Sequence, residues 1–455
     1  MKTNVINTRS ILPNSFRFDP SFHLSEAIIL GKDLDNVPYE KISIKDTNSK
    51  VFLGNIFSRI FVKDKEHGIP YLAASDTVLA DLNTGRFLSK KQSKELAYLM
   101  LKKDWIVITC SGTIGNVTYT NSTFENHIAT HDLIRIVPND EKILKGYLYA
   151  FLSSKYGYNQ LTQSRFGGVV KHINAAHVNG ITLPLFPVAF QKEVDDLIQE
   201  SARLREEATE ALEEAKNLIE EQFKDFKASL SQCSVSSKDI LSSHNKRFEA
   251  NYHIAEGKSL EDYIKGNFKW DLLGNLCSSI SRPELFKRYY VQNGLPFLGG
   301  ADLFLASPKS SKQLSKTKTS NIESLAIKEG TILLPRSGTI GDVAWAHYGH
   351  AQKLASEDVI RLLPNNILRE GYIYAFLTSA IGKNLIQRHI FGSVIQHIEP
   401  PHLKLIPVPI FDNTIIETTH SKVLEYSKKT GEAIQKEEKA IAMVEQEIKK
   451  WNNKL

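Results

Sequence analysis

The sequence repeats itself over most of its length, and this duplication constrains the fold more than any other feature. The pentapeptide Ser-Gly-Thr-Ile-Gly occurs unchanged at 111–115 and at 337–341. The segment YLYAFLSS at 147–154 returns as YIYAFLTS at 372–379. Matched segments keep their order and lie 220 to 230 residues apart. Such conserved order indicates duplication of a whole domain.

Two further segments extend the match toward both ends of each copy. RFDPSFH at 17–23 returns as RFEANYH at 247–253, and FGGVVKHI at 166–173 returns as FGSVIQHI at 391–398. We therefore expect two copies of one domain, which agrees with a chain of 455 residues that is too long for one ordinary domain.

The two copies differ most in one long stretch, residues 57–101 in the first and roughly 278–329 in the second. A shared frame with one divergent stretch suits two similar domains that each contact something different. The composition, 42% hydrophobic and 24% charged, is that of a globular protein.

Each copy ends in a predicted long helix, at 190–223 and at 414–451. Apolar or small residues recur there in alternating steps of three and four, as in a coiled coil. They are Val194, Leu197, Ser201, Leu204, Ala208, Ala211, Ala215 and Leu218, and then Thr430, Ile434, Glu437, Ile441, Val444, Ile448 and Trp451. So narrow a stripe predicts that the two helices pack closely against each other. The alternative is that each folds back on its own domain.

The rest of each copy predicts a mixed α/β domain. Short apolar runs ending at a Ser-Gly-Thr-Ile-Gly segment read as strands joined to return strands by a tight turn. A turn of this kind can instead cradle an anion through backbone N–H groups. The predicted strands are 105–109, 117–119, 133–137, 331–335, 343–345 and 359–363, and the predicted short helices are 146–154 and 371–379.

Charge is distributed unevenly along the chain. Net charge is +6, but residues 192–221 hold eleven acidic and four basic residues, so that the remainder carries +13. A basic protein with one acidic helix favours a polyanionic partner, of which nucleic acid is the commonest. Lysine-rich surface loops alone are the alternative.

Motifs for catalysis and cofactor binding are absent from the sequence. There is no P-loop, no zinc or nucleophile motif and no glycine-rich dinucleotide loop, and we expect no cofactor in this chain. Three cysteines without a C-x-x-C pair indicate a reducing cytoplasm. No run is long and apolar enough to cross a membrane.

Several polar residues recur in both copies and could suggest a site. The histidine pairs His23/His253, His172/His397 and His177/His402 lack metal-ligand spacing, and we predict core or turn roles and no metal. Asp132 and Asp358 recur before Arg135 and Arg361, which predicts internal ion pairs. The competing hypothesis is a cryptic hydrolase or nuclease that uses these carboxylates with the histidines.

These motifs, occurring twice in one order and each time followed by a long charged helix, resemble the specificity (S) subunit of a type I restriction–modification enzyme. The resemblance covers nearly the whole chain. It implies two globular α/β (α+β) target-recognition domains, related by pseudo-twofold symmetry and separated by an antiparallel two-helix coiled coil. The implied boundaries are 1–15 (N-terminal segment), 16–188 (first domain), 189–228 (first helix), 229–245 (polar linker), 246–410 (second domain) and 411–455 (second helix).

The resemblance also implies partners. Such a subunit reads a bipartite site in double-stranded DNA and has no catalysis of its own. It recruits two adenine-methylating modification subunits, which use S-adenosylmethionine, and through them restriction/translocase subunits that use ATP and Mg²⁺. A coiled-coil scaffold without DNA specificity is the alternative from another class.

DNA contacts are expected from basic and amide side chains on the divergent stretches and beside the shared glycine segment. In the first copy these are Arg59, Lys63, Lys65, Arg86, Lys90, Lys91, Arg165 and Lys171. In the second copy they are Arg282, Lys287, Arg288, Lys309, Lys312, Lys316, Arg388 and Gln396.

Overall fold

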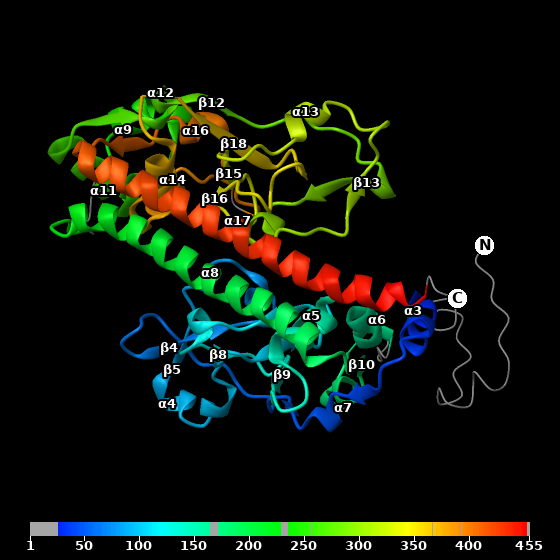
Figure 1. Ribbon diagram of the computed structural model, residues 1–455. Helices are drawn as coiled ribbons and strands as arrows, with labels where there is room; N and C mark the ends of the chain where they lie inside the picture. The colour runs from blue at the N-terminus through cyan, green and yellow to red at the C-terminus, as the bar shows by residue number, and fades with distance from the viewer. Residues whose placement is uncertain are drawn as a thin grey trace. The chain divides into compact units, whose positions relative to one another are not determined.

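The computed structural model describes residues 26–163, 172–228, 235–254, 256–365, 367–392 and 394–452 (Figure 1). The chain divides into two compact units. The first joins residues 1–206 to 432–455, and the second is residues 207–431. Each unit holds one sequence repeat together with the end of the long helix that follows the other repeat.

The frame of the first unit is a four-stranded antiparallel sheet in the order β2–β9–β6–β7, next to a two-stranded pair β1–β10. The side chains of β6 are all buried because helices cover one face of this sheet and a second sheet lies on the other side. The strands are β1 (Lys41–Ser43), β2 (Lys50–Phe52), β6 (Ile106–Thr109), β7 (Val117–Tyr119), β9 (Leu133–Val137) and β10 (Thr182–Pro184).

The Ser-Gly-Thr-Ile-Gly segment is the turn of the β6–β7 hairpin, as one of its two interpretations predicted. Gly112 and Gly115 have φ of +67° and +88°, values that favour glycine. Gly338 and Gly341 of the second copy have φ of +83° and +108°. The pentapeptide is therefore repeated because this turn needs positive φ twice.

The divergent stretch of the first copy, residues 57–101, forms a separate sheet that also takes up strand β8 from later in the chain, and we call the divergent stretch the first lobe (57–101). Its strand order is β3–β5–β4–β8, and β4 and β8 are parallel. The strands are β3 (Phe61–Val62), β4 (Gly68–Leu72), β5 (Phe87–Ser89) and β8 (Ile128–Ala129), with the short helix α4 (Lys90–Ser93) directly after β5. The lobe has one small core of its own and shares a second with the frame strands β6 and β9.

Helices cover the frame of the first unit. The segment 147–152, predicted to be helical, is wholly buried in α5 because it packs between the sheet and the long helices. The helices are α3 (Glu26–Asp35), α5 (Lys145–Ser153), α6 (Lys155–Gln163), α7 (Ala175–Asn179) and α8 (Val188–Glu220).

The second unit repeats this architecture. Its frame sheet has the order β12–β18–β15–β16 beside the pair β11–β19. Its divergent stretch, which we call the second lobe (278–329), begins within β12 and forms the sheet β14–β13–β17 with strand β17 from later in the chain. The strands are β11 (Trp270–Leu272), β12 (Cys277–Ser281), β13 (Tyr290–Leu298), β14 (Gln313–Leu314), β15 (Ile332–Pro335), β16 (Ala344–Trp345), β17 (Leu354–Ala355), β18 (Val359–Pro364) and β19 (Pro407–Pro409). The helices are α9 (Ser237–Ser242), α10 (Ala250–Ile254), α11 (Glu256–Asn267), α12 (Leu273–Leu276), α13 (Ile322–Leu325), α14 (Glu370–Thr378), α15 (Ala380–Arg388), α16 (Pro400–Leu403) and α17 (Asn413–Lys450). The predicted fold class, two mixed α/β repeats, is confirmed.

The helices α8 and α17 pack against each other in antiparallel directions within each unit (green and orange to red in Figure 1). In the second unit, Lys429 pairs with Glu207 at 2.8 Å and Lys422 pairs with Glu214 at 2.5 Å. In the first unit, Ser201 Oγ donates to the Ala433 carbonyl at 2.7 Å. The close approach follows from small seam residues, all of them buried: Ser201, Ala208, Ala211 and Ala215.

Each unit uses the other repeat's helix to cap one of its own. Glu445 of α17 accepts from the backbone N–H of Lys155 at 2.7 Å, where α6 begins. Glu220 of α8 accepts from the N–H of Ala380 at 2.9 Å, where α15 begins. A carboxylate at a helix start satisfies a free N–H group and interacts favourably with the helix dipole.

One prediction about the frame was wrong. Arg135 of β9 does not pair with Asp132, but is fully buried and donates to the carbonyls of Leu99, Ala129 and Thr130 at 3.0 to 3.3 Å. A strand side chain points away from its sheet, and this one reaches the lobe backbone, whereas Asp132 lies 3.5 Å from the His131 ring. Burial lowers the pKa of Arg135 to about 10, so the guanidinium stays charged at neutral pH.

Arg361 of β18 has the same environment in the second unit. It donates to the carbonyls of Val359, Leu325 and Ala355 at 2.7, 3.2 and 3.0 Å. Asp358 instead pairs with Arg336 at 3.4 Å. Each frame strand therefore holds its lobe through a buried cation bonded to main-chain oxygens.

The predicted polar linker contains a short helix in its described part. α9 begins after Ser236, whose hydroxyl accepts a hydrogen bond from the Asp239 N–H at 3.2 Å. In return, the Asp239 carboxylate accepts a hydrogen bond from the Ser236 N–H at 3.0 Å. This capping box explains a helix in a serine-rich segment that carries no apolar periodicity. Among the described residues, no helix is long and apolar enough to cross a membrane.

Replacing Arg135 by methionine should destabilise the first unit. The change removes the four hydrogen bonds that the guanidinium donates to main-chain carbonyls. Because a buried carbonyl left without a donor costs about 1–3 kcal/mol, we expect a loss of about 3 kcal/mol or more in the free energy of unfolding. Urea denaturation measures it, with Lys94→Met, an exposed lysine of the same lobe, as control. Equal stabilities of the two variants would contradict the anchoring role.

Candidate nucleic-acid interface

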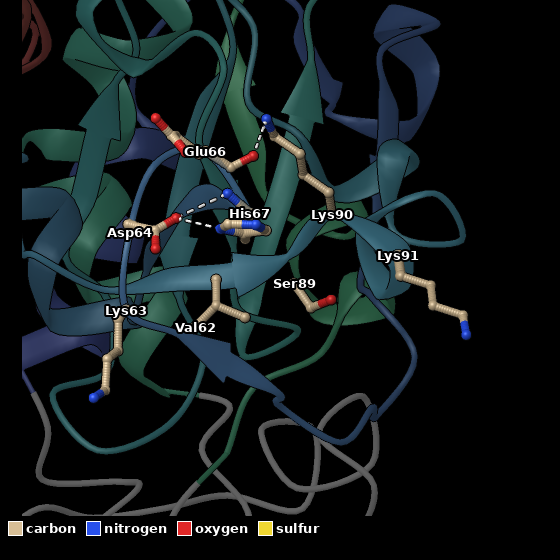
Figure 2. Close-up of a pocket in the computed structure, with 8 residues that line it drawn as sticks. All are labelled: Val62, Lys63, Asp64, Glu66, His67, Ser89, Lys90 and Lys91. Atoms are coloured by element: carbon tan, nitrogen blue, oxygen red, sulfur yellow. Dashed lines mark hydrogen bonds and ion pairs between the residues drawn. The ribbon is translucent and has the colours of Figure 1, made fainter.

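Lysines of the first lobe gather around an open hollow at strands β3 and β5. The hollow is lined by Val62, Lys63, Asp64, Glu66, His67, Ser89, Lys90 and Lys91. Lys90 donates from Nζ to the Glu66 carbonyl at 2.6 Å. Figure 2 shows Lys63 and Lys91 extending away from the hollow on opposite sides. The structure therefore brings three of the predicted lysines around one hollow of the lobe. Lys65 is also exposed.

One acidic group of this edge is already occupied. The Asp64 carboxylate accepts from the His67 N–H at 3.0 Å and contacts the His67 ring at 2.8 Å. These hydrogen bonds lower the pKa of Asp64. The Asp64 carboxylate is therefore bonded within its own turn, to His67, and the neighbouring lysines remain exposed.

The second lobe presents lysines from two segments. Lys287 and Lys318 both lie over the ring of Tyr289, at 5.2 and 5.8 Å from its centroid. The other predicted lysines of this lobe, all exposed, are Lys309, Lys312 and Lys316. The sequence prediction missed Lys318, although it continues the same lysine-rich run. Eight basic and four acidic residues make this lobe more positive than the first, which has seven and five.

The predicted arginines of the lobes are held by protein partners, whereas Lys63 and Lys91 extend outward (Figure 2). Arg86 pairs with Asp76. Arg282 pairs with Glu399 at 3.1 Å. These two guanidinium groups stabilise the lobes and are not freely presented to a ligand.

Arg59 and Arg288 occupy matching positions, which the sequence alignment of the repeats did not indicate. Arg59 donates to Thr130 Oγ1 at 3.1 Å, and Arg288 donates to Ser356 Oγ at 3.3 Å. Thr130 and Ser356 are equivalent in the two copies. Each guanidinium also lies over an equivalent ring, that of Tyr71 or Phe297. Both arginines are therefore held by equivalent partners, a ring on β4 or β13 and a hydroxyl directly after β8 or β17.

Four predicted contacts beside the glycine segments have different outcomes. Arg388 is buried, pairs with Glu261 and donates to the Tyr252 carbonyl at 2.9 Å, so it serves the core of the second unit and is not at a surface. Gln396 is exposed. Arg165 and Lys171 lie outside the described residues.

The repeated histidines that the structure describes form turns and caps. The His177 ring lies 2.7 Å from Asn174 Oδ1, where α7 begins, and the His402 ring lies 3.3 Å from the Glu399 nitrogen, where α16 begins. Within the described ranges, no three His, Cys, Asp or Glu side chains are grouped as metal ligands would be. Burial raises the pKa of Cys110 to about 11, which keeps this thiol neutral at neutral pH.

A family comparison agrees with this organisation. The model for the type I restriction modification DNA specificity domain matches residues 36–214 and 269–441. The chain therefore belongs to this family and carries the domain twice. It is a specificity subunit of the type I restriction–modification class, and its role is DNA recognition. A comparison with curated proteins gave no match.

Solved structures with similarity to the chain include two subunits of restriction-modification systems. The type-I restriction-modification S subunit from M. genitalium is 14% identical, with a TM-score of 0.36, covering 92% of this chain and 96% of that one. The HsdS subunit from Thermoanaerobacter tengcongensis is 14% identical, with a TM-score of 0.27, covering 93% and 95%.

Removing the outward lysines should weaken DNA binding without altering its sequence preference. Each phosphate contact contributes about 0.9 to the slope of log affinity against log salt. For Lys63→Ala combined with Lys91→Ala we expect the slope to fall by up to about two. Binding titrations at several salt concentrations measure it, with Lys45→Ala, an exposed lysine of the first frame, as control. An unchanged slope would remove these lysines from the interface.

Proposed function

We propose that the chain reads a bipartite site in double-stranded DNA, one half-site for each lobe. The observation that carries this proposal is the contrast between the two kinds of structure in each repeat. The frames share their sequence, turns and buried arginines, whereas the lobes differ and expose lysines. Two similar frames that carry different lobes suit a DNA target whose two halves differ in sequence. Lysines would contact phosphates, which position a protein without specifying sequence.

Recruitment of enzymes completes the proposal. The chain itself carries no catalysis and no cofactor, and acts in the cytoplasm with two adenine-methylating modification subunits and with restriction subunits. S-adenosylmethionine, ATP and Mg²⁺ would be bound by those partners. The buried, neutral thiol of Cys110 and the capping roles of His177 and His402 support this reading over a nuclease.

A scaffold without DNA specificity is the competing function. It would need the long helices but gives no reason for divergence confined to the two lobes. It also gives no reason for lysines that face outward while the lobe arginines are internally paired.

Exchanging the first lobe should change one half of the target only. Residues 57–101 would be replaced by the equivalent stretch of another specificity subunit, and we expect methylation to move to a site with one new half and one old half. The exchange should fold because Arg135 binds main-chain oxygens, which any sequence provides. Mapping of methylated adenines in host DNA measures the outcome.

The matched control is exchange of 278–329, which should change the other half. If either exchange altered both halves, or if neither did, the modular reading would fail.

Lengthening both long helices should widen the gap between the half-sites. Seven residues inserted after Glu210 of α8 and after Glu425 of α17 keep the antiparallel seam in register and add about 10 Å. We expect a gap wider by up to about three base pairs, at 3.4 Å each. Methylation mapping reads it, and insertion into α8 alone, which breaks the seam, is the control for misfolding. A folded double insertion with an unchanged gap would contradict the spacing role.

A further inference from the structure

A narrow hairpin of the second unit exposes two adjacent aliphatic side chains. Val394 is 94% exposed and Ile395 is 63% exposed. Single exposed apolar residues are common, whereas two neighbours exposed to this degree on one hairpin form a candidate contact surface.

The base of this hairpin is firmly built. Phe391 and His397 exchange two backbone hydrogen bonds of 2.9 and 2.7 Å. The next residue, Ile398, is buried and donates to the Arg336 carbonyl at 3.0 Å, and Arg247 holds the Ile390 carbonyl at 2.6 Å. The exposed tip therefore projects from a fixed support.

The first copy of the repeat also has two adjacent aliphatic residues at these positions. Its segment FGGVVKHI places Val169 and Val170 at the matching positions, followed by Lys171 where the second copy has Gln396; these residues of the first copy lie outside the described structure. Two aliphatic residues are thus kept in both repeats although the lobes diverge. Whatever they contact is common to both halves, which argues against sequence-specific base reading.

The size and surroundings of the tip favour DNA over a protein partner. A specific protein interface buries about 1,200 Å² or more, which two side chains on a hairpin tip do not supply. A step between base pairs, by contrast, accepts one or two apolar side chains as a wedge. Gln396, directly after the pair, is exposed and carries an amide that can bond a base edge.

The root of the hairpin also lies beside the second lobe. Glu399 bonds Arg336 at 2.6 Å and Arg282 at 3.1 Å, and Arg282 is where the divergent stretch leaves β12. The root of the hairpin and the start of the divergent stretch are therefore joined by one cluster of ion pairs.

We propose that Val394 and Ile395 form an apolar wedge that enters duplex DNA between two stacked base pairs at the second half-site. The inference rests on the proposed DNA-reading function and adds a deformation of the DNA to it. Unstacking one step costs free energy, which the additional contacts of a kinked duplex offset.

The test uses the full-length chain and a duplex that carries its mapped target, with 2-aminopurine at each adenine in or beside the second half-site. The fluorescence of 2-aminopurine rises when its base is unstacked. We expect binding of the unaltered chain to raise it at one step. Val394→Ser with Ile395→Ser should abolish that rise and weaken binding about tenfold. The salt slope should not change, because no phosphate contact is lost.

Ile367→Ser is the matched control, since Ile367 is a 67% exposed aliphatic residue of the same unit; it should leave affinity and fluorescence unchanged. Thermal unfolding should be the same for all variants because these side chains are exposed. Specific binding without a fluorescence rise at any step, or with unaltered affinity of the double variant, would overturn the wedge and leave the proposed function standing. A chain that binds no specific DNA would overturn both.

Discussion

A buried arginine that binds main-chain oxygens holds each recognition lobe to its frame, and the other features of the repeat depend on this contact. Arg135 and Arg361 lie at equivalent positions of the central strands β9 and β18, and each donates to carbonyls of the lobe side. A buried charge is costly unless it is hydrogen-bonded. Carbonyl oxygens supply those bonds whatever side chains the lobe carries. An anchor of this kind fixes the position of the lobe but leaves its sequence free, which is the combination that a family of readers with different targets needs.

The need for a rigid lobe also explains why arginine and lysine have different roles there. Arginine forms planar, multidentate contacts and suits fixed internal pairs, whereas lysine is a flexible point charge. In the lobes Arg86 and Arg282 are paired with carboxylates, and Arg59 and Arg288 brace equivalent aromatic rings and hydroxyls. The lysines face outward. Internal arginines keep the lobe rigid, so that the exposed lysines meet a phosphate backbone from a fixed platform.

The sequence predicted those parts of the structure that follow from repeats, turn residues and apolar periodicity. The duplication predicted two like domains, the glycines of the pentapeptide predicted the hairpin turn, and the three–four periodicity predicted the packed helices. It could not predict the partners of Arg135, because every residue type has a backbone carbonyl and the sequence therefore does not show which carbonyls accept a hydrogen bond. The nearby Asp132 was the plausible but wrong partner. Arg388 was misplaced for a related reason. Its carboxylate partner, Glu261, lies 127 positions away on α11, and only the fold shows that the two meet.

The exchange of helix ends gives the frame a constraint that the lobes lack. Glu445 caps α6 in the first unit, and Glu220 caps α15 in the second, so each repeat is completed by a carboxylate from the helix that follows the other. The core of each unit likewise includes apolar side chains from that helix, such as Val444 in the first and Ile219 in the second. A substitution in either long helix therefore affects the packing of both repeats, whereas a substitution in a lobe affects only one repeat. Because neither unit is complete without both helices, the frames must stay alike while the lobes diverge, and this is the pattern of similarity and difference that the two halves of the sequence display.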